Sequence, residues 1–137
     1  MYKEYSQPAP LERIIAGLSY FTGGGVGFLW IIFAALTHNE LRTFLRYHVY
    51  QSIFLSILYF LLSTFLGLLL RILSYVPFLK NLIGNITFYF TAPIVNHMSL
   101  INVLILLVMF YLIITSVLGK YSYIPWVSDI IKYNTGR

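Results

Sequence analysis

Three long stretches of this chain contain no charged residue: 14–37, 47–70 and 81–119. A run of about 20 apolar residues is the length that an α-helix needs to cross a hydrocarbon core of about 30 Å. A domain of 137 residues could not bury three such runs if it were soluble. The sequence therefore predicts an α-helical membrane protein, with membrane lipids among its partners.

Composition and charge exclude several other classes. Hydrophobic residues make up 59% of the chain and charged residues 9%, whereas soluble domains are about one-quarter charged. The net charge of +5 comes from scattered Lys and Arg residues rather than a basic block, so no nucleic-acid partner is expected. The chain has no cysteine, which excludes disulfides and thiolate ligands.

Catalytic chemistry has little support in the sequence. The four carboxylates lie near the ends of the apolar stretches or in the tails, and no two of them form a spaced pair. The three histidines have no metal-ligand spacing. We therefore expect no enzymatic activity, no cofactor and no metal.

The apolar pattern predicts four membrane spans. We place them at about 11–36, 44–70, 79–95 and 100–118, in a single transmembrane domain covering 1–137. The third span is short because Pro93 should kink it or end it early, and Gly119 should stop the fourth. The expected fold class is all-α, an integral membrane four-helix bundle.

The distribution of Lys and Arg predicts the orientation of this bundle. With four spans both termini share a side, and that side would hold seven of the nine Lys and Arg residues. The opposite side would hold only Arg42 and Arg46. Since positive charges concentrate on the cytoplasmic side, we expect both termini on the cytoplasmic or stromal side.

The C-terminal tail, residues 121–133, is rich in tyrosine and contains Trp126. Val127, Ile130 and Ile131 fall on one face of a short helix, and such aromatics settle at the headgroup level. The pattern predicts a short interfacial segment that lies on the membrane surface. The alternative is a disordered tail.

Small residues recur every four positions in the first predicted span, at Ser19, Gly23 and Gly27. Small side chains allow close approach of another helix, so this row is a candidate helix-packing face. The alternative is an unwound break lining a cavity, because irregular backbone inside a membrane must be satisfied by protein or water.

Polar residues form rows in the second and third predicted spans. Such side chains usually face other helices or water. Two readings remain open, a hydrophilic path and hydrogen bonding between helices. The candidate path residues are His48, Ser52, Ser56, Ser63, Asn81, Asn85 and Asn96.

Two segments resemble the Tic-twenty family, the four-helix subunit of the plastid inner-envelope protein translocon and its cyanobacterial and plastid-encoded homologues. The first segment is 40–52, with the core Phe44-Leu45-Arg46-Tyr47-His48. The second is 119–131, which carries Gly119, Tyr121, Ile124 and Pro125. The opening 12–20 is similar more loosely.

The resemblance implies a non-enzymatic subunit of a preprotein translocation complex, in a plastid inner envelope or a cyanobacterial membrane. Four helices are too few to enclose a polypeptide. A protein-conducting channel would therefore need a homo-oligomer or other membrane subunits, with translocating polypeptides as further partners. The alternatives are an accessory or assembly subunit of a photosynthetic or respiratory complex, and a small oligomeric transporter.

Overall fold

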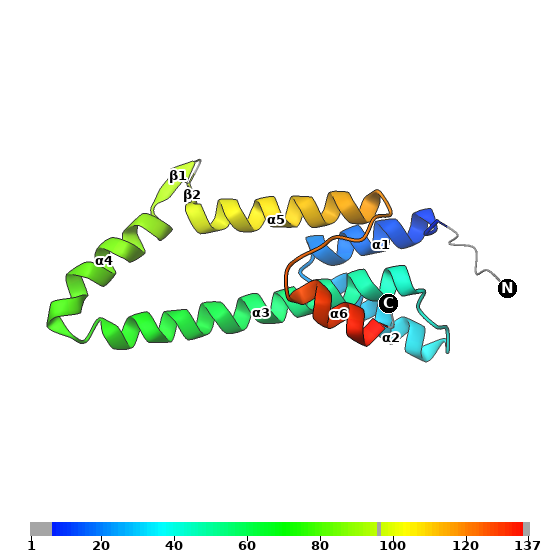
Figure 1. Cartoon of the computed structure of the whole chain (residues 1–137), viewed down its shortest axis with the longest axis horizontal. Coiled ribbons are helices and arrows are strands. Elements are labelled where there is room, and N and C mark those ends of the chain that lie inside the picture. Colours follow the sequence, from blue (N-terminus) through cyan, green and yellow to red (C-terminus); the bar gives the residue numbers. More distant parts are fainter. Residues whose placement is uncertain (1–6, 96, 136–137) are drawn as a thin grey trace. The chain divides into compact units, whose positions relative to one another are not determined.

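The computed structural model describes residues 7–95 and 97–135, and these residues form helices and one short strand pair (Figure 1). The helices are α1 (Pro10–Phe21), α2 (Gly25–Leu36), α3 (Thr43–Leu73), α4 (Pro77–Thr91), α5 (Leu100–Val117) and α6 (Val127–Thr135). The strands β1 (Pro93–Val95) and β2 (Met98–Ser99) pair antiparallel. The predicted all-α class is confirmed.

The chain divides into two compact units. Unit 1 comprises the described residues up to Ile57 together with those from Met109, and unit 2 is Leu58–Val108. Unit 1 holds α1, α2, the start of α3, the end of α5 and the tail with α6. Unit 2 holds the rest of α3, α4, the strand pair and the start of α5.

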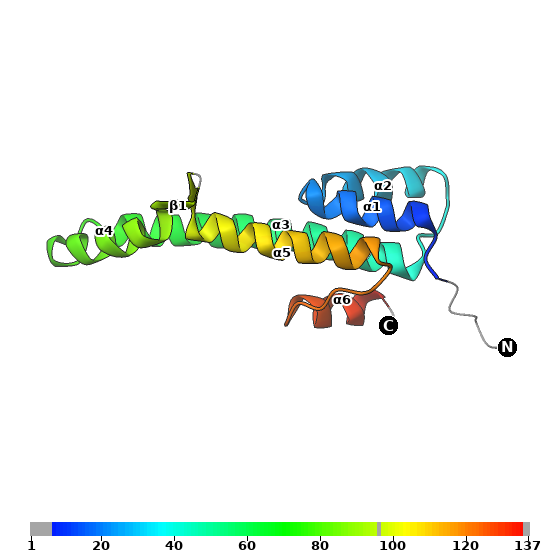
Figure 2. The same ribbon diagram turned by 90° about the horizontal axis from the view of Figure 1, so that it is seen from above.

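The predicted single span over 11–36 was wrong, because this segment folds into a hairpin of two twelve-residue helices. The chain reverses at Gly23 and Gly24, whose φ angles are +60° and +88°. Glycine reaches this left-handed region without steric cost. Figure 2 shows α1 and α2 lying side by side. Each helix is about 18 Å long, too short to cross a bilayer.

The helices predicted over 44–70 and 100–118 are present as α3 and α5. Gly119 follows α5 with φ +73° and ends it. Both helices are long and apolar enough to cross a membrane. In α3 0% of the most apolar segment is buried within the protein, and in α5 11% is buried. A core helix of a soluble protein would be mostly buried, so this exposure favours a membrane location.

The third predicted span, 79–95, ends early. Helix α4 has fifteen residues, and Ala92 after it is extended, with φ −59° and ψ 138°. Steric clash with Pro93 disfavours the helical conformation of Ala92, and the chain continues as β1. Within the described residues only α3 and α5 qualify as candidate spans, so the four-span bundle is not confirmed.

The predicted placement of Arg42, on the side opposite the start of the first span at Glu12, also differs from the structure. A single span over 11–36 would place the two residues on opposite membrane surfaces, about 30 Å apart. In the structure the Arg42 guanidinium lies 3.6 Å from the Glu12 carboxylate. The hairpin returns the chain to its starting level, which brings the two side chains together.

The tail is folded against unit 1 rather than disordered. Helix α6 buries Val127, Ser128 and Ile131, whereas Ile130 is 47% exposed. The predicted apolar face was therefore wrong at Ile130, because the helix turns a serine inward instead. That serine takes part in the buried polar cluster described next.

Candidate functional site

The interior of unit 1 contains a polar cluster centred on Gln51 of α3. The Gln51 carbonyl oxygen accepts hydrogen bonds from the hydroxyls of Tyr20 (2.7 Å) and Ser122 (2.8 Å). Its amide nitrogen donates to Ser128 Oγ at 3.1 Å. All four side chains are at most 3% exposed. One side chain thus joins α1, α3, the tail and α6.

His48 completes the cluster through Tyr20. Its Nδ1 lies 2.9 Å from the Tyr20 hydroxyl oxygen. Because the Tyr20 hydroxyl donates its proton to Gln51, His48 must donate from Nδ1, which assigns the tautomer from the network. Buried polar groups need such partners, since an unsatisfied one costs about 1–3 kcal/mol.

Aromatic rings surround His48. Tyr121 of the tail stacks on the imidazole with centroids 5.8 Å apart and planes at 16°. The ring centroids of Phe44 and Tyr47 lie 4.5 Å and 5.3 Å from that of His48. The Tyr47 hydroxyl donates to the Ser122 carbonyl oxygen at 2.6 Å. The tail is held against α3 by rings and by hydrogen bonds.

The motif residues that carry the family resemblance meet in this part of unit 1. Leu45 belongs to the apolar core, and the Arg46 side chain donates to the Leu41 carbonyl oxygen at 3.1 Å. Ile124 donates its backbone N–H to Ser128 Oγ at 2.7 Å. A Cβ at Gly119 would lie 2.9 Å from Arg13 Nε, and the φ of +73° disfavours any side chain there.

The predicted helix-packing residues lie where α1, α2 and α3 contact one another. Ser19 Oγ lies 2.5 Å from Ser52 Oγ. A Cβ at Gly27 would overlap Ser19 Oγ and come within 2.9 Å of Val49. Gly23 lies in the turn, beside Ser56. The small residues therefore serve packing within this chain.

The predicted path residues separate into two groups. His48 and Ser52 are buried in the interior of unit 1, and Ser56 is half-buried there. In unit 2 Ser63 is exposed and donates to the carbonyl oxygen of Phe60. Asn81 and Asn85 are exposed on α4, and Asn96 lies outside the described residues. Hydrogen bonding between helices accounts for His48 and Ser52.

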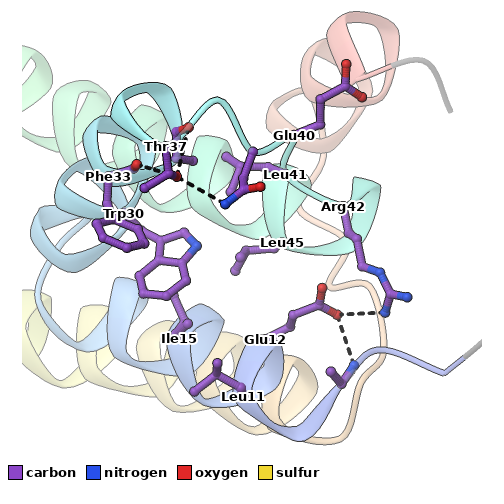
Figure 3. A pocket seen from close by; sticks show the side chains of 13 residues that line it. Leu11, Glu12, Ile15, Trp30, Phe33, Thr37, Glu40, Leu41, Arg42 and Leu45 are labelled. Atoms are coloured by element: carbon purple, nitrogen blue, oxygen red, sulfur yellow. Dashed lines mark hydrogen bonds and ion pairs between the residues drawn. The ribbon is translucent and has the colours of Figure 1, made fainter.

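An open cavity of about 470 Å³ lies in unit 1 between α1, α2 and the start of α3. Its wall is apolar, with Ile15, Trp30 and Leu45 (Figure 3). Glu12 and Arg42 face each other at its edge. Glu12 Oε2 also accepts the Ala9 backbone N–H at 2.9 Å, so this carboxylate is already engaged.

The polar cluster is set apart from the two cavities of unit 1. Neither this cavity nor a second one at the glycine turn is lined by Tyr20, His48 or Gln51. Among the described residues, no group of three or more His, Cys, Asp and Glu side chains could hold a metal ion. The cluster can fix the tail in place, which is what its hydrogen bonds do.

Sequence reasoning missed the centre of the cluster. Gln51 is not singled out from the sequence, and Tyr20, Ser122 and Ser128 are not named as its partners. One feature of the sequence could have predicted this centre. Gln51 is the one carboxamide in α3, and a carboxamide inside a membrane helix usually bonds across to a neighbouring helix.

Comparisons with family models, curated proteins and solved structures find no significant match to this chain.

Proposed function

We propose that this chain is a non-enzymatic membrane subunit of a preprotein translocation complex, in a plastid inner envelope or a cyanobacterial membrane. Helices α3 and α5, the two candidate spans, would anchor it in the bilayer. The proposed role comes from the resemblance of segments 12–20, 40–52 and 119–131 to the Tic-twenty family. Unit 1 contains all three segments.

The observation that carries this proposal is that the three segments interlock. Tyr20 from the first, Gln51 from the second and Ser122 from the third share hydrogen bonds in one buried cluster. Each short match is weak by itself. Their joint burial in one network supports reading them as a single structural element rather than three unrelated coincidences.

Any conducting surface in this proposal lies outside the core of unit 1. His48 and Ser52 are engaged in internal contacts and are at most 2% exposed. We assign unit 1 the role of a scaffold that holds α3, α5 and the tail. A channel would then form between copies of this chain or with other membrane subunits.

Cross-linking coupled to mass spectrometry tests the proposal on the chain purified natively from its own membrane in mild detergent. Photoreactive probes at Trp126 and Tyr59, which are 83% and 55% exposed, sample the tail and α3. We expect cross-links to translocon subunits and to an arrested precursor. The same chain without irradiation is the control.

Other outcomes would overturn the proposed role. Cross-links confined to one photosynthetic or respiratory complex would support an accessory or assembly subunit. Solute flux through liposomes that contain only this chain would support a small oligomeric transporter. In either case the resemblance would report ancestry rather than present function.

A further inference from the structure

We propose that the α1–α2 hairpin is a re-entrant membrane element. It enters and leaves the bilayer from one side, and its glycine turn lies among the acyl chains of a single leaflet. This inference concerns how the chain meets lipid, and it holds or fails independently of the proposed translocation role.

The first argument is the apolar surface of the hairpin. No charged residue occurs from Ile14 to Thr37. Eight large apolar side chains point outward, with exposed fractions between 41% and 75%: Ile14, Leu18, Phe21, Phe28, Leu29, Ile32, Phe33 and Leu36. An apolar surface of this extent is normally shielded from water by another protein or by a membrane. Lipid acyl chains can contact the exposed side chains of both helices at once.

The second argument is the position of the hairpin's open end. Glu12 at the start of α1 pairs with Arg42 just before α3, and Arg13 lies against Gly119 just after α5. The start of α3 and the end of α5 are therefore at the same level as the two ends of the hairpin. These charged side chains mark a membrane surface.

The third argument is depth. Helix α1 runs antiparallel to the end of α5, with Arg13 beside Gly119 and Gly17 beside Val117. The turn at Gly23 lies ten residues beyond Arg13, the charged residue at the membrane surface, and is therefore at most about 15 Å deep at 1.5 Å per residue. That depth falls within one leaflet of a core about 30 Å thick.

The turn itself is suited to an apolar surrounding. The backbone N–H groups of Gly23, Gly24 and Gly25 donate to the carbonyl oxygens of Tyr20, Ser19 and Thr22. The Thr22 hydroxyl donates to the Leu18 carbonyl oxygen at 2.9 Å. Irregular backbone at membrane depth is tolerated where its polar groups are satisfied in this way.

This topology changes the distribution of positive charge. Among the described residues, Arg13, Arg42, Arg46, Lys120 and Lys132 belong to the side of the hairpin's open end, whereas Arg71 and Lys80 follow the other end of α3. Five against two places the open end on the cytoplasmic or stromal side. The first and last described residues remain on that side, now with two spans instead of four.

Single-cysteine labelling tests the topology without background, because the chain has no cysteine. Three exposed positions are used, Asn39→Cys, Lys120→Cys and Ser74→Cys, in sealed membrane vesicles of one orientation with a membrane-impermeant maleimide. We expect Asn39→Cys and Lys120→Cys to label from the same side and Ser74→Cys from the other. Labelling of Asn39→Cys together with Ser74→Cys would show a spanning segment and overturn the proposal.

Spin labels identify what covers the hairpin. Leu29→Cys and, as a second site, Phe21→Cys are measured in phosphatidylcholine liposomes that contain only the full chain, with Asn39→Cys as the water-exposed control. We expect frequent collisions with oxygen and few with a water-soluble nickel complex at Leu29 and Phe21. Frequent nickel collisions would place the hairpin in water, and few collisions of either kind would mean that a second copy covers it. Both outcomes would overturn the proposal.

Discussion

The side-chain amide of Gln51 donates a hydrogen bond to Ser128 Oγ at 3.1 Å, across 77 residues of sequence. The same serine oxygen accepts the backbone N–H of Ile124 at 2.7 Å. A single carboxamide in α3 thus sets the position of α6. The tail that the sequence placed at the membrane surface is tied to the interior of unit 1.

Replacing Gln51 tests the role of the cluster. In Gln51→Leu the hydroxyls of Tyr20, Ser122 and Ser128 lose their shared partner inside the protein. At about 1–3 kcal/mol for a buried unsatisfied group, we expect the free energy of unfolding to fall by about 2–4 kcal/mol. Amide hydrogen exchange in mild detergent should show α6 exchanging faster.

The control for this change is Ser63→Ala. Ser63 is exposed and bonds only its own helix backbone among the interactions described, so the effect should stay within about 0.5 kcal/mol. Equal protection of α6 in the wild type and in Gln51→Leu would show that apolar packing alone holds the tail.

Gly27→Ala tests the close packing between α1, α2 and α3. The added methyl group would overlap Ser19 Oγ and lie 2.9 Å from Val49 Cγ1. Overpacking of this kind costs about 1–3 kcal/mol. Thermal unfolding in detergent, followed by circular dichroism, should show a lower Tm than the wild type.

Gly67→Ala is the matched control, because a Cβ there meets nothing within 4 Å. Removing a glycine from a helix interior stabilises the helix by up to about 1 kcal/mol. Opposite shifts in Tm are therefore expected for the two glycines. Similar shifts would contradict the observed packing at Gly27.

Gly24→Ala tests the turn of the hairpin. Its φ of +88° disfavours any side chain, and a Cβ would lie 2.9 Å from the backbone Cα of Ile53. We expect a loss of about 1–3 kcal/mol, with the hairpin opening first. Amide hydrogen exchange in α1 and α2 in mild detergent, compared with the wild type, measures that opening.

The neighbouring Gly25→Ala serves as its control. Gly25 begins α2, and a Cβ there makes only ordinary contact with Thr22 at 3.7 Å. The amides of α1 and α2 in this variant should exchange as slowly as those of the wild type. If both variants behaved alike, the turn would not depend on the left-handed conformation of Gly24.

Two adjacent isoleucines distinguish the faces of α6. Ile131 is 4% exposed and Ile130 is 47% exposed. Ile131→Ala should cost about 2–5 kcal/mol, the range for truncation of a buried isoleucine. Ile130→Ala should change the unfolding free energy of the same chain by about 0.5 kcal/mol or less. Denaturant titration in detergent measures both variants. A larger loss of unfolding free energy in Ile130→Ala than in Ile131→Ala would show that Ile130, rather than Ile131, faces the interior.

The predictions that held rest on patterns within single helices. The uncharged stretch 47–70 corresponds to α3, and 100–118 corresponds to α5 with its stop at Gly119. The predictions that failed concern where a helix breaks. The sequence places Gly23 in a row of small residues within one expected span, and a glycine permits a turn without requiring one.

A pattern within one helix also could not predict the hydrogen-bond partners of each polar residue. His48 and Ser52 follow helical spacing along one face, yet their partners Tyr20 and Ser19 lie on another helix. Ser128 was missed because its neighbours in sequence are apolar or charged, and a serine can bond its own backbone as easily as a distant side chain.

By itself the sequence determined the helical class, the two long apolar helices and the lack of charge between Ile14 and Thr37, because charge and apolar periodicity act locally along a chain. The tertiary structure decided that Glu12 meets Arg42 and that Gln51 meets Ser128. Such pairings depend on where the chain reverses and on which side chain fills a shared interior, and both follow from packing between segments distant in sequence.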